Sequence, residues 1–173
     1  VVTGNSIGNF YSRSELHYFP DNNSCGIHIN GDNTIIEKNR IFNIKVYWGF
    51  VEGIRTSGRN VKIANNFITD ILSHLFETVG IFSYCYGKQL IVNNSVNIFG
   101  EPATDVSGSD ERCLLLTRRV VNTDTIFVKN NIFSVNIPNP ERDCYLIEMY
   151  DSVNSTKNLI GNNCYYFDEV HRP

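Results

Sequence analysis

Apolar and polar residues alternate with a period of two in short runs along this chain, a pattern typical of β-strands. Residues 26–30 read Gly-Ile-His-Ile-Asn, and residues 53–57 read Gly-Ile-Arg-Thr-Ser. Successive side chains of a strand point to opposite faces, so we expect the isoleucines to face a core and His28 and Arg55 to face outward. Asn, Gly and Thr are poor helix formers. The pattern therefore predicts an all-β chain.

A second pattern is a motif that occurs six times: an aliphatic residue, two residues, Asn, one residue, then an apolar residue. Its asparagines are Asn5, Asn39, Asn66, Asn94, Asn131 and Asn163. They follow one another at steps of roughly 27 to 37 residues, and a period in this range is typical of a solenoid built from repeats.

Two copies, residues 26–44 and 53–71, align without a gap. The aligned pairs include Gly26 and Gly53, Ile36 and Ile63, and Asn39 and Asn66. Within one repeat we expect strands at residues 26–30, 34–38 and 40–44, with a bend at Asn39. Three short strands per repeat, stacked in parallel, predict a parallel β-helix of about five to six coils.

The recurring asparagines have a structural explanation. A one-residue bend between strands needs a residue that tolerates a left-handed φ, and Asn is one of the few that do. Stacked strands lie about 4.8 Å apart, so the side-chain amides can hydrogen-bond from one repeat to the next. We expect the six asparagines to form an internal ladder and to have no catalytic role.

These repeats resemble the right-handed parallel β-helix superfamily typified by pectate lyases, which includes polygalacturonases, alginate lyases and phage tailspikes. The resemblance covers nearly the whole chain and implies a right-handed, single-stranded solenoid. It also implies that the first strands of the repeats, with the long loops leading into them, form a cleft that binds polysaccharide. One fold supports many chemistries, so function has to be argued from a site.

Length and charge narrow the function classes. The 173 residues predict a single domain, 1–173. The net charge is −3 without a basic run, which argues against a nucleic-acid partner because phosphate binding needs clustered Lys and Arg. No apolar stretch has the roughly 20 residues of a membrane span. Without an initiator Met, we expect a fragment or processed piece of a longer protein. For a protein that handles polysaccharide, we expect secretion or a place at the cell surface.

The loops at residues 45–52, 72–79, 99–112 and 136–143 are the long polar segments, where binding groups concentrate. Alternation predicts two outward columns, one of His28, Arg55, Phe82, Leu115 and Leu146, the other of Asn30, Ser57, Tyr84, Thr117 and Glu148. Aromatic rings beside polar groups suit the apolar face of a sugar. The candidate substrate-binding residues are Trp48, Ser57, His74, Phe82 and Tyr84, and the alternative is that the aromatic residues cover the outer face or an interface.

Two enzymatic chemistries are open. A polysaccharide lyase acting on uronates needs a base, often Arg or Lys in the resembled superfamily, and a cation such as Ca²⁺ on the substrate carboxylate. Arg55 is the candidate base, with His28 beside it, and Asp105 and Asp110 are candidate Ca²⁺ ligands because Ca²⁺ prefers oxygen. In the alternative interpretation, Arg55 pairs with Glu52 or Glu77 on the surface.

A glycoside hydrolase is the less favoured enzyme. It needs two carboxyl groups roughly 5 to 10 Å apart, for which Asp110, Glu111 and Glu148 are candidates. The paired-Asp and Gly-His-Gly motifs of polygalacturonases and the Asp-Pro-His motif of mannuronan epimerases are absent from the sequence.

A non-catalytic role belongs to a different class. Parallel β-helices also form stalks, adhesins and tailspike shafts. An outward stripe of Phe82, Leu115 and Leu146 would mark a contact surface. On this alternative, the chain is a structural or adhesive segment with end-to-end or lateral contacts to other chains.

Overall fold

The computed structural model describes residues 1–12, 23–100, 110–117, 125–137, 143–150 and 157–167, and in this part of the chain every regular element is a β-strand. The strands are β1 (Val2–Thr3), β2 (Ser6–Ser12), β3 (Ser24–Asn30), β4 (Ile35–Glu37), β5 (Arg40–Val46), β6 (Val51–Ala64), β7 (Phe67–Ser73), β8 (Thr78–Val92), β9 (Ser95–Phe99), β10 (Glu111–Thr117), β11 (Thr125–Lys129), β12 (Ile132–Asn136), β13 (Cys144–Tyr150), β14 (Lys157–Gly161) and β15 (Cys164–Phe167). Asp105 lies outside the described residues. The all-β prediction is confirmed for the described ranges.

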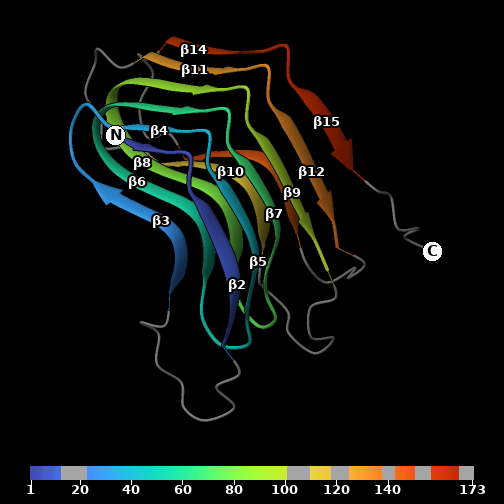
Figure 1. Cartoon of the computed structure of the whole chain (residues 1–173). Helices are drawn as coiled ribbons and strands as arrows, with labels where there is room; N and C mark the ends of the chain where they lie inside the picture. The colour runs from blue at the N-terminus through green and yellow to red at the C-terminus, as the bar shows by residue number, and fades with distance from the viewer. Residues whose placement is uncertain (13–22, 101–109, 118–124, 138–142, 151–156, 168–173) are drawn as a thin grey trace.

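The strands form two curled sheets in which the paired strands run parallel (Figure 1). One sheet has the order β1-β4-β6-β8-β10-β13, with β3 paired to β6 and β11 linking β8 to β14. The other has the order β15-β12-β9-β7-β5-β2. Each strand therefore lies beside its counterpart from the next repeat, which is why the sequence period and the strand order agree.

The long strands β6 and β8 each serve two parts of the larger sheet. Their first halves pair with β3 and β10, and their second halves pair with β4 and β11. The register between β6 and β8 shifts between Arg59 and Val61, next to Gly58 at φ 134° and Asn60 at φ 55°. The sequence analysis left residues 31–33 between two strands of the repeat. In β6 the equivalent residues, 58–60, form an irregularity inside one continuous strand.

Aliphatic side chains from all parts of both sheets fill the core. Columns of equivalent residues recur along it, and the fully buried members include Ile54, Ile81 and Leu114 from the first strands, Ile36, Ile63 and Ile91 from the second, and Ile41, Ile68 and Val96 from the third. Thr56 and Ser83, which alternation places inward, are also buried. Burial of these columns is the main stabilising contribution, because apolar area removed from water stabilises roughly in proportion.

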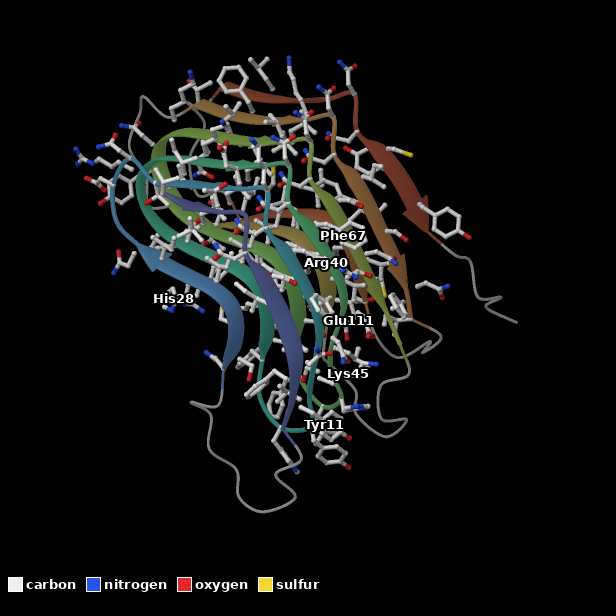
Figure 2. All side chains as sticks on the ribbon, in the orientation of Figure 1. Tyr11, His28, Arg40, Lys45, Phe67 and Glu111 are labelled. Atoms are coloured by element: carbon white, nitrogen blue, oxygen red, sulfur yellow. The ribbon has the colours of Figure 1, made fainter. Side chains whose placement is uncertain are left out.

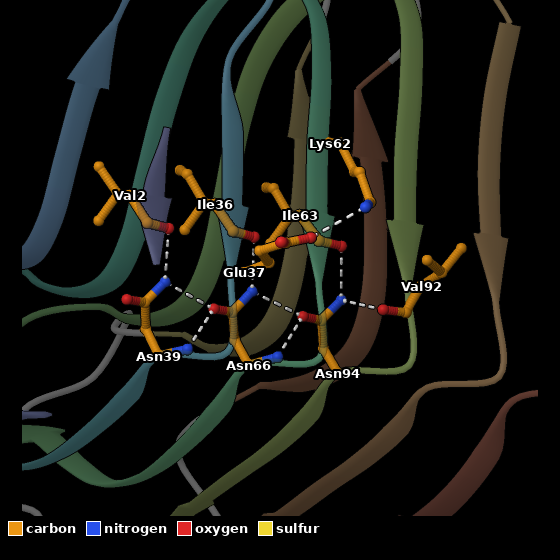
Figure 3. Close-up of polar contacts among 9 residues, drawn as sticks. All are labelled: Val2, Ile36, Glu37, Asn39, Lys62, Ile63, Asn66, Val92 and Asn94. Atoms are coloured by element: carbon orange, nitrogen blue, oxygen red, sulfur yellow. Dashed lines mark hydrogen bonds and ion pairs between the residues drawn. The ribbon is translucent and has the colours of Figure 1, made fainter. Parts of the chain in front are cut away.

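The six asparagines form the predicted ladder, and Figure 3 shows its middle members Asn39, Asn66 and Asn94. From Asn39 onward, each ladder side-chain oxygen accepts two N–H hydrogen bonds from the asparagine of the preceding repeat. For example, Asn39 N and Asn39 Nδ2 both donate to Asn66 Oδ1 at 3.0 Å. The amide nitrogen of Asn66 also donates to Ile36 O at 3.0 Å. The same bonds continue from Asn5 to Asn163. A buried amide satisfied on both sides holds neighbouring repeats in one register.

The bend itself lies one residue earlier than the sequence analysis placed it. The left-handed residues are those before the ladder asparagines, namely Gly4, Lys38, Asn65, Asn93, Asn130 and Asn162, with φ between 54° and 70°. Adjacent asparagines such as Asn65 and Asn66 therefore have separate roles. The first adopts the strained backbone conformation and is exposed, and the second is buried in the ladder.

Lys38 is the one residue in this left-handed column that is neither Gly nor Asn. Because a Cβ next to the carbonyl makes this conformation costly for most residues, Lys38→Asn is expected to raise the free energy of unfolding by about 0.5–1 kcal/mol. Chemical unfolding measures the change. Lys129→Asn, at a strand position without positive φ, is the control, and an equal gain there would contradict the explanation.

The predicted register of the last repeat is wrong by two residues. The predicted outward columns placed Leu146 beside Leu115 and Glu148 beside Thr117, whereas the structure pairs Cys144 with Glu111. Leu115 consequently lies beside Glu148, and Thr117 beside Tyr150. Strand β10 begins two residues before Cys113 because backbone pairing extends to the end of the preceding loop, where Glu111 N donates to Asp143 O at 2.9 Å.

The predicted apolar stripe on the outer face is also wrong. Leu115 is 7% exposed, Leu146 packs against the core cluster, and the Phe82 ring lies under the Arg55 guanidinium at 4.8 Å. These three residues therefore do not form a continuous exposed surface.

Candidate functional site

Two short segments, residues 47–50 and 74–77, connect the smaller sheet to the first strands and stack on each other. His74 N donates to Val46 O at 2.9 Å, and Ser73 Oγ donates to Gly49 O at 2.7 Å. Phe76 N in turn donates to Ser73 Oγ at 2.9 Å. These bonds hold both segments in place, and we call this end of the repeats the loop edge.

Five rings gather there, and we call Tyr47, Trp48, Phe50, His74 and Phe76 the loop-edge aromatic cluster. The Tyr47 and His74 ring centroids are 5.8 Å apart with planes tilted by 32°. Trp48 lies 6.0 Å from Phe76, which lies 5.6 Å from Phe50. Such separations are typical of favourable aromatic pairs. The sequence analysis named Trp48 and His74 separately, and the structure joins them through Tyr47, which is 37% exposed.

An acidic residue follows these rings in the chain. Glu77 follows Phe76, and its Oε2 lies 3.1 Å from Arg112 Nη1. Arg112 also pairs with Asp110 and with Glu148, and its side chain is only 3% exposed. We call Glu77, Asp110, Arg112 and Glu148 the Arg112 cluster. It joins the segment before β8 to β10 and β13, so a single guanidinium connects three successive repeats.

Burial and charge shift the acidities in this cluster. Burial raises the pKa of the Glu77 carboxyl above its ordinary value, and the Asp110 and Glu148 charges raise it further, against the opposing effect of Arg112. Burial alone would lower the pKa of Arg112, but its hydrogen bond to Glu148 and the surrounding carboxylates raise it. The guanidinium is therefore held in its charged form, while Glu77 is the carboxyl that takes up a proton more readily than usual.

The predicted catalytic residues are not gathered around one point. Arg55 Nη1 lies 2.8 Å from Glu52 Oε1, which is the pairing that the sequence analysis gave as the alternative. The Arg55 guanidinium is thus held by a carboxylate and also stacks on the Phe82 ring at 4.8 Å, and this geometry opposes a role as a base. His28 is exposed and lies beside Arg55 in register, whereas Glu148 belongs to the Arg112 cluster.

The remaining predicted binding residues lie further along the same strands. Ser57 pairs in register with Tyr84, which is 40% exposed, and Arg55 pairs with Phe82. Figure 2 shows His28 well separated from Lys45, which lies two residues before Tyr47 in the chain. The structure therefore divides the predicted set between the loop edge, with Trp48 and His74, and the middle of the first strands.

Asp110, a predicted Ca²⁺ ligand, forms an ion pair with Arg112 through its carboxylate. Within the described ranges, no group of three or more His, Cys, Asp or Glu side chains is arranged to hold a metal ion.

Sequence reasoning missed Arg112 and its pairing with Glu77, and it placed Glu52 on the surface although Glu52 is buried. One signal was available, because Glu77, Asp110 and Asp143 are equally spaced along the chain. The strand register agrees with that spacing, because Glu111 pairs with both Thr78 and Cys144. These three residues directly follow Asp110, Glu77 and Asp143, respectively. An acidic column at the loop edge could thus have been inferred from the sequence.

Glu52 makes a pH-dependent contribution to stability. Glu52 is 5% exposed, and its Oε2 atom has no hydrogen-bond partner among the described residues. Burial raises the pKa of this carboxyl, with Arg55 acting in the opposite direction. A group with a raised folded-state pKa stabilises fully below its unfolded pKa, and that contribution is lost as the pH rises through the folded value.

Glu52→Gln is therefore expected to reduce the loss of stability that the protein shows between about pH 5 and pH 8. At about pH 8 the variant is expected to unfold a few degrees higher, because each kcal/mol of stability raises the unfolding temperature by about 2–4 °C. Thermal unfolding across this pH range measures it. Glu37→Gln is the control: its Lys62 partner lowers the Glu37 pKa, so that contribution is lost as the pH falls. Identical pH profiles for the two variants would contradict the assignment.

No helix in the described part of the chain is long and apolar enough to cross a lipid bilayer. No protein-family model matches the sequence, and no curated protein or solved structure matches it significantly.

Proposed function

We propose that this chain is a single-domain, right-handed parallel β-helix that binds polysaccharide at its loop edge. The finding that most supports this is the loop-edge aromatic cluster, in which residues 47–50 and 74–77 bring five rings together and one of them, Tyr47, is partly exposed. A sugar ring has an apolar face of C–H groups that packs on an aromatic face. Tyr47 and His74 also carry polar ring groups, which suit the hydroxyls of a sugar. On this proposal the protein acts outside the cell or at its surface.

Pre-organisation also supports a binding role. Both segments are held by backbone and Ser73 hydrogen bonds, and Gly49 allows the tight turn with φ 117°. The indole Nε1 of Trp48 is buried without a hydrogen-bond partner among the described residues. A rigid site loses little conformational freedom on binding, so more of the contact energy is expressed as affinity.

Binding is better supported than catalysis. The lyase hypothesis needs Arg55 as a base with His28 nearby, and Arg55 is paired with Glu52 and stacked on Phe82. The hydrolase hypothesis needs two free carboxyls, and Asp110 and Glu148 are both paired with Arg112. Both activities stay predictions, and the polysaccharide association does not depend on either.

Calorimetric titration with a panel of neutral, acidic and amino-sugar oligosaccharides tests the proposal. Tyr47→Ala is expected to weaken binding about tenfold, the effect of losing roughly 1.4 kcal/mol of contact energy. Tyr84→Ala is the matched control, because Tyr84 is similarly exposed but lies in the middle of β8. Binding that depends on Tyr84 and not on Tyr47 would move the site to the first-strand face, and no binding at all would refute the proposal.

A structural role in a larger assembly is the second candidate. Large apolar side chains are exposed on β13, β14 and β15, namely Tyr150, Leu159, Ile160, Tyr165 and Tyr166. Exposed strand edges with apolar residues favour pairing with other chains. Light scattering across a concentration series tests this role, which predicts a mass that grows with concentration and an absence of saccharide binding.

A further inference from the structure

Among the residues that the structure describes, the loop edge has more negative than positive charge. In the Arg112 cluster, three carboxylates surround one guanidinium. The carboxylates are partly exposed, with side-chain exposures of 35% for Glu77, 23% for Asp110 and 18% for Glu148, whereas Arg112 is 3% exposed. A ligand approaching from solvent therefore meets the carboxylates and not the guanidinium.

Neighbouring groups add to this excess. Asp143, one repeat beyond Asp110, is exposed, and its carbonyl oxygen accepts the Glu111 N–H bond. Its charge raises the pKa of the Tyr145 hydroxyl. Two described cations of the neighbouring strands have acidic partners of their own, since Arg55 pairs with Glu52 and Lys45 pairs with Asp70 at 2.9 Å.

The acidic groups adjoin the aromatic cluster. Glu77 directly follows Phe76 in the chain, and Thr78 N donates to Asp110 O at 3.2 Å. Phe76 contacts both Trp48 and Phe50. A saccharide packed on these rings would thus place its substituents close to Glu77, where a positive substituent is attracted and a carboxylate is repelled.

We infer that the loop edge selects polysaccharides carrying ammonium groups, such as polymers of a free amino sugar, over neutral ones and over those carrying uronate carboxylates. This inference rests on the proposed function, and it changes the ligand class from the acidic polysaccharide that the superfamily resemblance implies. Partly exposed ion pairs are worth little individually, so each engaged ammonium group contributes an affinity gain of about two- to fivefold, and several along one chain multiply.

Three oligosaccharides of equal length test the inference by calorimetric titration: a glucosamine oligomer, its fully N-acetylated form and an oligogalacturonate. The first two share one backbone and differ in charge. The glucosamine oligomer is expected to bind at least about fivefold more tightly than the N-acetylated form in low salt, and raising the salt to about 0.3 M is expected to reduce this ratio because screening weakens exposed ion pairs.

Two variants locate the effect. Glu77→Gln and Asp143→Asn are each expected to lower the glucosamine preference while leaving the affinity for the N-acetylated oligomer within about twofold. Within the described residues, Asp143 makes no ion pair with Arg112, so its variant stays informative if Glu77→Gln disturbs the fold. Glu37→Gln, which removes a carboxylate paired with Lys62 away from this edge, is the matched control and is expected to keep the full preference.

The outcomes separate the two proposals. Equal affinity for the glucosamine and N-acetylated oligomers, or tighter binding of the oligogalacturonate, overturns the charge preference and leaves saccharide binding intact. A preference that survives in both Glu77→Gln and Asp143→Asn also overturns it. If none of the three oligosaccharides binds, the proposed function fails and the preference fails with it.

Discussion

Replacing Asn66 with alanine is expected to lower the free energy of unfolding by about 3–5 kcal/mol, a large part of the stability of an ordinary domain. The Asn66 side chain makes four hydrogen bonds: it accepts from Asn39 N and Nδ2, and it donates to Ile36 O and Asn94 Oδ1. Asn66 is 2% exposed, so water cannot replace these partners. Each buried group left unsatisfied costs about 1–3 kcal/mol.

The neighbouring residue provides the control. Asn65 is exposed with φ 56°, and glycine adopts that conformation without strain, so Asn65→Gly is expected to change the free energy of unfolding by less than about 0.5 kcal/mol. Urea unfolding of both variants measures the contrast. Equal effects at positions 65 and 66 would show that the ladder contributes no more than the bend does.

Replacing Gly53 with alanine is expected to destabilise the protein by more than about 3 kcal/mol, beyond the usual cost of overpacking. A Cβ at this position would lie 2.5 Å from Gly80 O and 2.7 Å from Ile68 Cγ2. The first of these is a backbone atom of the next repeat, so the clash can be relieved only by separating strands whose pairing is part of the core. The cost is high because the backbone itself must shift.

Gly161→Ala is the matched control, because a Cβ there meets nothing within 4 Å. That variant is expected to differ from the parent protein by less than about 0.5 kcal/mol in the free energy of unfolding, as substitutions without new contacts usually do. Thermal unfolding measures both variants. A Gly53→Ala protein as stable as the parent would show that the strands at this point pack less tightly than the geometry indicates.

The repeating parts of the structure were predictable from local pattern. One constant offset aligns Gly26 with Gly53 and Asn39 with Asn66, and the structure pairs the surrounding strands at that same offset. The glycines recur because each strand approaches its neighbour too closely for a Cβ. The ladder asparagines recur because each amide bonds to the next, so that one requirement is repeated in every copy.

The candidate site was predictable only in part. Trp48 and His74 could be assigned to loops, because loops are the long polar segments of the chain. Their meeting through Tyr47 depends on the stacking of two segments from successive repeats, which the alignment implied but the sequence analysis did not follow through. The predicted register of the last repeat was wrong because the step between paired strands there, as from Leu115 to Glu148, is two residues longer than the predicted step from Leu115 to Leu146. No second aligned motif in that repeat was used to check it.

By itself, the sequence determined the strands, their repeat and the asparagine column, because each of these follows from a short-range requirement that recurs at a regular spacing. Only the tertiary structure decided which charges meet. Arg55 pairs with Glu52, and Arg112 gathers Glu77, Asp110 and Glu148 from three repeats. Long charged side chains choose partners by proximity and burial, and neither quantity exists until the repeats have stacked.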